Sequence, residues 1–546
     1  MRKALVLIFS RFSSFGLITL AALALLLLPS PASVSGQSVA GQTTSYDLVI
    51  ANGLVHDGLG GPPRQADVAI KDGRIGAIGT LASATAARRI DASGRHVAPG
   101  FIDVHSHAEG GLVRDGLQQG QPLLAQGVTT IVGNPDGGGP VDLPGQRGQL
   151  EQRGLGPNVA LLIGHGSVRG AVLGMAEAAP TPAQLDQMKA LVKTAMDAGA
   201  YGLSSGLFYA PGSYAKLDEV IELAKVVSPY NGVYTSHIRD EGNYTIGLIA
   251  SVDEVIRVAD EGRVIGIVSH MKALGPDTWG KSAEAIQHIE SARARGVKVF
   301  ADQYPYEASS TSLTGAVIPR WAQVGGDAAM VARFADATQR EKLLAEVREN
   351  IRRRGGPASL VVAHYRPDRS LEGKNLGEIA SARGLSPEAA AIALISAGSV
   401  SIVSFNMSED DIERIMRQPW TMTSSDGGLV FPNEGVPHPR NYGAFARKIA
   451  RYVNERKTVS LDAAIRSMTS LPADVFGMTD RGVLRPGAWA DVVVFDPKTV
   501  RDVATYTKPH QLATGMDYVV VTGQIVVDGG RFTSALPGKV LLKTRK

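Results

Sequence analysis

Apolar runs that end beside a histidine recur through the middle of the chain and limit the folds open to it. Residues 159–163, 233–236 and 264–269 form such runs, and they are followed by His165, His237 and His270. Amphipathic segments separate the runs, as in parallel βαβ units. From about residue 98 the sequence therefore predicts a parallel α/β barrel, whose strand ends share one face.

Short apolar segments separated by glycine-containing turns lie at both ends of the chain. They cover residues 48–50, 67–70 and 74–78, and again 491–495, 518–521 and 524–527. This alternation of short apolar segments and turns is typical of hairpin strands. We expect one small β-sandwich built from residues 37–97 and 477–546, with the barrel (98–476) inserted between its halves. A charged, helical segment predicts an excursion from the barrel at about 313–360.

The first residues resemble a cleaved signal peptide (1–36). Arg2, Lys3 and Arg11 precede or flank an apolar run from Gly16 to Leu28, and small residues and prolines follow without any acid. Thirteen apolar residues are fewer than the roughly twenty that span a bilayer, which disfavours a membrane anchor. We expect cleavage between Ala32 and Gly36, a periplasmic or secreted protein, and no stable membrane anchor afterwards.

Charge and cysteine content narrow the classes of partner. The formal charge of +4 falls to +1 once the three leader cations are removed, so nucleic-acid binding has no electrostatic support. The chain has no cysteine, and a core of this size does not need disulfides. The sequence does not indicate an oligomeric state.

Four histidines have the placement of metal ligands. His105 and His107 alternate after the apolar segment 99–104, which would direct both imidazoles to one side, whereas His237 and His270 end two further strands. A pair of strand histidines can also be purely structural. As a set at one barrel face, however, the four predict a metal site.

A carboxylate that can act as a base follows a late apolar segment. Asp426 stands before Gly427 and Gly428, which let other groups approach closely. An aspartate in this position can simply form a turn. Beside a metal it can also take a proton from water and deliver it to a leaving amine, as amide hydrolysis requires.

The chain after the leader resembles the amidohydrolase superfamily and, within it, the N-acyl-D-amino-acid deacylases (D-aminoacylases). The motifs that carry this resemblance are DASG (91–94), APGFIDVHSH (98–107), GVTT (127–130), SSGL (204–207), SHIR (236–239), SHMK (269–272), DQYPY (302–306), SSD (424–426), HPR (438–440) and GVLRPG (482–487). The resemblance implies a distorted (β/α)8 TIM-type barrel, a terminal β-sandwich, one or two zinc ions, and hydrolysis of N-acyl-D-amino acids.

The same resemblance implies roles for individual residues. His237 and His270 are similar to tight zinc ligands, and His105 and His107 to ligands of a second or weaker site. Asp426 corresponds to the general base and acid. Lys272, Tyr304 and Arg440 match positions that hold the substrate carboxylate, with Ser310 as a further candidate for substrate binding.

The family's cysteine ligand is missing. D-aminoacylases place a cysteine after a Gly-Asn pair, but here Gly133-Asn134 is followed by Pro135 and Asp136. Asp136 can supply a carboxylate oxygen instead, or it can merely begin the Asp-Gly-Gly-Gly turn. Because a carboxylate is a harder donor than sulfur, manganese or cobalt would compete better with zinc.

Three functions remain open from the sequence. The first is hydrolysis of a linear N-acyl-D-amino acid. A cyclic amidase or a D-residue dipeptidase would use the same metal site, although Lys272 and Arg440 favour a substrate with a free carboxylate. The third is a metal-free scaffold or binding protein, and retention of four histidines together with Asp426 argues against it.

Overall fold

The computed structural model describes residues 45–544. The predicted leader and its cleavage site fall within residues 1–44 and so lie outside the described residues. Within the described range, no helix has both the length and the apolar character needed to cross a bilayer.

The central domain is a barrel of parallel strands in eight positions. The strand order is β6-β8-β9 and then β10-β11-β12-β13-β14-β18, and β9 leads into β10 across a break at Leu162. All these pairs are parallel, as the sequence predicts. The strands are β6 (Phe101–Asp103), β8 (Val128–Gly133), β9 (Asn158–Leu161), β10 (Ile163–Gly164), β11 (Gly202–Gly206), β12 (Val233–His237), β13 (Ile265–Val268), β14 (Val299–Gln303) and β18 (Thr421–Thr423).

The first and last barrel positions are joined through the segments that follow them. The Ser425 amide donates to Asp103 Oδ1 (2.9 Å), and the Asp426 amide donates to the His105 carbonyl (2.9 Å). Next to these bonds, β7 (Ser106–His107) pairs in parallel with β19 (Gly427–Gly428). This closure of the barrel therefore holds the segment with His105 and His107 against the segment with Asp426.

Helices with one apolar side cover the barrel. In α5, Thr181 and Gln184 form a reciprocal capping box, and Met188, Val192 and Met196 lie on the buried side. The helices of this domain are α1 (Glu109–Leu112), α2 (Gln121–Leu124), α3 (Leu143–Arg153), α4 (His165–Leu173), α5 (Pro182–Asp197), α6 (Leu217–Val227), α7 (Gly247–Gly262), α8 (Ser282–Ala294), α14 (Glu409–Met416), α15 (Arg440–Arg447), α16 (Leu461–Met468) and α17 (Ser470–Phe476).

Both ends of the described chain build one nine-stranded sheet, ordered β23-β22-β21-β20-β5-β1-β2-β3 with β4 on β1. At the turn between β2 and β3, Asp72 (φ 50°) and Gly73 (φ 75°) take the left-handed conformation of a tight hairpin. The strands are β1 (Tyr46–Val55), β2 (Arg64–Lys71), β3 (Arg74–Gly79), β4 (Ala86–Asp91), β5 (His96–Pro99), β20 (Val492–Phe495), β21 (Met516–Val521), β22 (Gln524–Asp528) and β23 (Arg531–Phe532).

The end of the chain departs from the expected β-sandwich. Strand β24 (Val540–Leu541) leaves the nine-stranded sheet and pairs in parallel with the barrel strand β9. The Val159 amide also donates to the Lys539 carbonyl (2.9 Å). β24 therefore lies on the side of β9 opposite β8.

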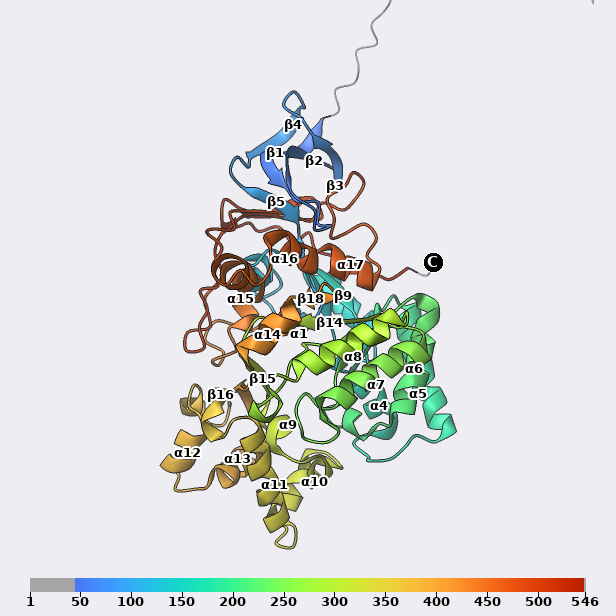
Figure 1. Cartoon of the computed structure of the whole chain (residues 1–546), viewed down its shortest axis with the longest axis vertical. Helices are drawn as coiled ribbons and strands as arrows, with labels where there is room; N and C mark the ends of the chain where they lie inside the picture. Colours follow the sequence, from blue (N-terminus) through green and yellow to red (C-terminus); the bar gives the residue numbers. More distant parts are fainter. Residues whose placement is uncertain (1–44, 545–546) are drawn as a thin grey trace, which may run out of the picture. The chain divides into compact units, whose positions relative to one another are not determined.

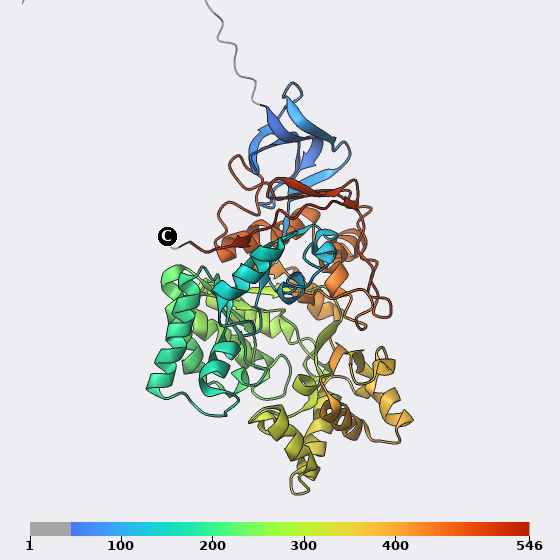
Figure 2. The same ribbon diagram turned by 180° about the vertical axis from the view of Figure 1, so that it is seen from behind.

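The excursion from the barrel is longer than the expected 313–360. It begins with β15 (Ala308–Ser312) and ends with β17 (Ser401–Phe405), which pair along their whole length and, with β16, form an antiparallel sheet. Beyond residue 360 the sequence of the excursion alternates strand and helix in the same way as the barrel units. Its end could therefore not be recognised from the sequence. Figures 1 and 2 show its helices gathered away from the barrel helices, and they enclose a separate apolar core. Its other elements are α9 (Leu313–Val317), α10 (Asp327–Ala335), α11 (Arg340–Arg353), β16 (Leu360–His364), α12 (Leu376–Ala382) and α13 (Pro387–Ala397).

Candidate metal centre and active site

The first histidine pair converges even though its strand is interrupted. β6 ends at Asp103 and β7 begins at Ser106, so His105 lies between strands rather than within one. The buried Asp103 accepts from the amides of His105 (3.3 Å) and Ser425 (2.9 Å), which fixes this turn. The two imidazole rings meet edge to face with centroids 5.5 Å apart.

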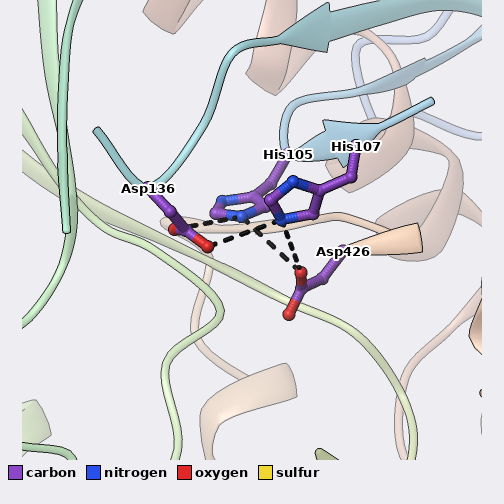
Figure 3. A group of neighbouring side chains, drawn as sticks. All are labelled: His105, His107, Asp136 and Asp426. Carbon is purple, nitrogen blue, oxygen red and sulfur yellow. Dashed lines mark ion pairs between the residues drawn. The ribbon is translucent and has the colours of Figure 1, made fainter. Parts of the chain in front are cut away.

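Asp136 is delivered by a tightly held loop after β8. Asn134 (φ 59°) and Asp136 (φ 55°) both take left-handed backbone conformations, which aspartate and asparagine tolerate better than most residues. Two hydrogen bonds join the side-chain amides of Asn134 and Gln146 (2.8 and 2.9 Å). Asp136 therefore does lie in a turn, as one of the two interpretations predicted. Its carboxylate also points into the site (Figure 3).

The Asp136 carboxylate lies between the two histidine pairs. Its Oδ1 is 3.3 Å from His105 Nε2 and 3.4 Å from His270 Nε2. Its Oδ2 is 3.4 Å from His107 Nε2 and 3.8 Å from His237 Nδ1. Two groups with the spacing of metal ligands result, and both contain Asp136: His105, His107, Asp136 and Asp426; and Asp136, His237 and His270.

The second histidine pair comes from the ends of neighbouring strands. His237 is the last residue of β12, and His270 follows β13 with a left-handed backbone (φ 35°). The His270 amide donates to Asp302 Oδ1 (2.9 Å), which holds the turn. The two ring centroids are 4.5 Å apart.

Asp426 lies where the first histidine pair meets Arg440. Its Oδ1 is 3.3 Å from His107 Nε2, and its Oδ2 is 2.8 Å from Arg440 Nη1 (Figure 3 shows the histidine side). Burial alone would raise the pKa of Asp426, but the charges of Arg440 and His270 outweigh burial and hold that pKa well below its usual value. Asp426 is therefore ionised at neutral pH in the metal-free site.

The residues predicted to bind substrate line one cavity of about 500 Å³ together with Asp136 and Asp426. They are Lys272, Tyr304, Ser310 and Arg440. The Tyr304 ring lies 4.7 Å from the Arg440 guanidinium and 5.6 Å from Lys272 Nζ. Arg440 Nε and Nη1 are buried without a well-aligned hydrogen bond, since the contact with Asp426 is close but poorly directed. Ser310 contributes to the wall on β15.

Glu241 also belongs to this site, although sequence reasoning did not identify it. Its carboxylate forms an ion pair with Lys272 and lies 3.0 Å from His270 Nδ1 and 3.7 Å from His237 Nε2. Burial would raise the pKa of Glu241, but Lys272 and the two histidines lower it well below normal. The only signal in the sequence is an acid four residues after His237, at a strand end.

The donor set fits a divalent metal. His105 Nε2, Asp136 Oδ1 and both ring nitrogens of His237 are buried and have no hydrogen-bond partner among residues 45–544, an arrangement that is costly unless a ligand satisfies them. Imidazole nitrogens and carboxylate oxygens are normal zinc ligands. The two groups that share Asp136 provide room for one ion or for two.

Comparison with known proteins identifies the family of the chain. Residues 88–527 match the model of the Amidohydrolase family, and the chain belongs to that family. It is 38% identical over 518 residues to an N-acyl-D-glutamate deacylase of Alcaligenes xylosoxydans xylosoxydans, covering 91% of this chain and 96% of that protein.

Two solved structures show the same fold across nearly the whole chain. One is an N-acyl-D-glutamate deacylase from Bordetella bronchiseptica with zinc and a phosphonate inhibitor (35% identity, TM-score 0.79, covering 92% of this chain and 100% of that one). The other is a D-aminoacylase described with a binuclear metal centre (32% identity, TM-score 0.78, covering 91% and 100%). The expected fold class is thereby confirmed.

Metal uptake is expected to release protons. Desolvation alone would lower the pKa of His107 and of His270, but the neighbouring carboxylates outweigh it and raise each pKa to about 10 in the metal-free site. Below that pH both rings are protonated, and ligation must displace these protons, so affinity rises with pH. Calorimetric titration of zinc at pH 8 in buffers of different ionisation enthalpy should show release of about two protons.

A variant that lacks one candidate ligand tests whether the released protons come from the metal-binding histidines. His107→Asn should release one proton fewer, whereas His288→Asn, which removes a histidine paired with Asp253 outside the cavity, should match the wild type. Metal affinity that does not change between pH 6.5 and 8.5 would contradict the expectation.

Glu241→Gln is expected to weaken zinc binding about 10- to 100-fold, the usual effect of losing a carboxylate behind a metal-binding histidine. The Glu241 carboxylate and Lys272 Nζ lie 3.0 and 2.8 Å from His270 Nδ1, and they hold the ring with Nε2 facing Asp136. Zinc affinity measured by competition with a chelator tests this. Glu254→Gln, which affects only an ion pair with Arg239 outside the cavity, is the matched control, and equal affinities in the two variants would count against the role of Glu241.

Proposed function

We propose that this chain hydrolyses the amide bond of N-acyl-D-amino acids to a carboxylate and a free D-amino acid, with zinc or another divalent metal. One observation carries the proposal. A single carboxylate, Asp136, lies within 3.8 Å of all four predicted histidine ligands, and the cavity around it also contains Asp426, Lys272 and Arg440.

His105, His107, Asp136, His237 and His270 would hold one or two ions. A divalent ion bound there would polarise the scissile carbonyl and make a water molecule more acidic. Asp136 supplies a carboxylate oxygen to this set of ligands. Oxygen ligation should admit manganese or cobalt beside zinc.

Asp426 acts as the proton carrier in this proposal. Its pKa lies well below the usual value, so it begins as a carboxylate that takes a proton from the attacking water. After the carbonyl carbon has been attacked, the same proton passes to the departing amine nitrogen. The Arg440 contact 2.8 Å from Oδ2 orients the carboxylate with Oδ1 toward His107.

The substrate α-carboxylate is bound by Arg440, Lys272 and Tyr304, with Ser310 on the same wall. Arg440 Nε has no hydrogen-bond partner within the described part of the chain, and a guanidinium fork suits a carboxylate. A fixed α-carboxylate allows the configuration at Cα to decide whether the acyl carbon reaches the metal. This arrangement favours an open-chain substrate over a cyclic amide.

The test combines metal analysis with hydrolysis of N-acetyl-D- and N-acetyl-L-amino acids before and after chelation. We expect near-stoichiometric zinc and D-selective release of amino acid that chelation abolishes. Asp426→Asn should keep the metal but lose at least about 1,000-fold in kcat, because proton transfer is lost.

Other results would favour other functions. Metal without D-selective activity would support a cyclic-amide or D-dipeptide substrate, and a protein that neither contains nor accepts metal would support a scaffold. Normal turnover in Asp426→Asn would contradict the assigned base even if the deacylase activity is present.

We further propose that the protein is exported and its leader removed. The basic, acid-free start, the short apolar run and the small residues after it support this proposal. N-terminal sequencing of protein from a periplasmic or culture fraction should give a first residue between Ser33 and Gln37. Recovery of the uncut chain in the cytoplasm would contradict it.

A further inference from the structure

Arg354 is a buried cation on the wall of the active-site cavity. It follows α11 directly, in the excursion from the barrel, and its side chain is 2% exposed. The residue lines the same cavity as Asp136, Lys272 and Arg440. The excursion therefore contributes a charge to the wall of a site whose metal ligands all come from the barrel.

The hydrogen bonds of Arg354 go to neutral oxygens. Its Nε donates to the Tyr244 hydroxyl (2.7 Å), and its Nη1 is 3.5 Å from Ser404 Oγ. Among residues 45–544 no carboxylate lies within ion-pair distance of it. A charged group buried in this way is costly unless an opposite charge reaches it.

The lysine and the other arginine that line the cavity each already pair with an acid. Lys272 pairs with Glu241, and Arg440 with Asp426. Among the lining acids, Asp136 contacts the histidines, and Glu434 pairs with Arg114 (2.9 Å). Arg354 is thus the one lining lysine or arginine of the described chain without an acidic partner.

We propose that Arg354 binds a second carboxylate on the substrate, so that the enzyme selects N-acylated D-amino acids with acidic side chains. This inference rests on the proposed function, in which Arg440, Lys272 and Tyr304 hold the α-carboxylate. The lining hydroxyls of Ser309, Ser312 and Ser401 add hydrogen-bond donors to the wall that the excursion contributes. A guanidinium is suited to a carboxylate in such surroundings.

The test compares kcat/KM for N-acetyl-D-glutamate and N-acetyl-D-glutamine, which differ in charge but hardly in shape. The wild type should favour glutamate by about 100-fold, the range of a buried charge-assisted hydrogen bond. Arg354→Met should lower the value for glutamate by about 100-fold and change the value for glutamine by less than about threefold. Arg354→Lys should retain part of the preference.

Controls separate charge recognition from folding. Arg352→Met removes an exposed arginine that pairs with Asp277 and Glu349, outside the cavity, and should behave as the wild type. Zinc content and the thermal unfolding midpoint of each variant show whether the site is intact. Equal losses for glutamate and glutamine in Arg354→Met would mean a structural role and would overturn the proposal.

The remaining comparisons distinguish this inference from the function on which it rests. Hydrolysis of N-acetyl-D-leucine and N-acetyl-D-glutamine as fast as of the glutamate compound would overturn the acidic preference but keep the deacylase function. No hydrolysis of any of the three would overturn both. If Arg354→Met selectively impairs N-succinyl-D-leucine and spares N-acetyl-D-glutamate, the second carboxylate belongs to the acyl group, and the side-chain assignment is wrong.

Discussion

The carboxylate of Asp136 is the contact on which the site depends. Four imidazoles from separate segments of the barrel approach this one acid, and three of them, on His105, His237 and His270, are buried and would be costly without a partner. Its loop reaches this position through two left-handed residues and the paired amides of Asn134 and Gln146. In a chain without cysteine, this loop places a carboxylate where it can serve both groups of candidate metal ligands.

The site also shows how charge is distributed between two structural units. The barrel supplies the histidines, Asp136, Asp426 and the paired cations Lys272 and Arg440, and its excursion supplies Arg354. Because the excursion has its own apolar core, its wall can vary without disturbing the metal ligands. In the proposed function, the metal ligands and the residue that selects the substrate would therefore belong to separately packed parts of the molecule.

Much of the fold could be predicted from the sequence, because period-two strands, capped helices such as α5 and histidines at strand ends are local signals. Other features are not local. Glu241 faces Lys272 only through the meeting of two loops, and the end of the excursion depends on β15 pairing with β17, about ninety residues later. The interruption of the strand at His105 could not be predicted either, because the alternation of residues in a continuous strand would direct both imidazoles to the same side.

The pairing of β24 with β9 has a consequence for the order of folding. The nine-stranded sheet needs both β1 and β20–β23, and β9 pairs with β24, which lies near the C-terminus. Contacts between such distant segments form late and slowly. Both sheets can therefore be completed only once residues 492–541 are available to pair with strands that precede them by several hundred residues.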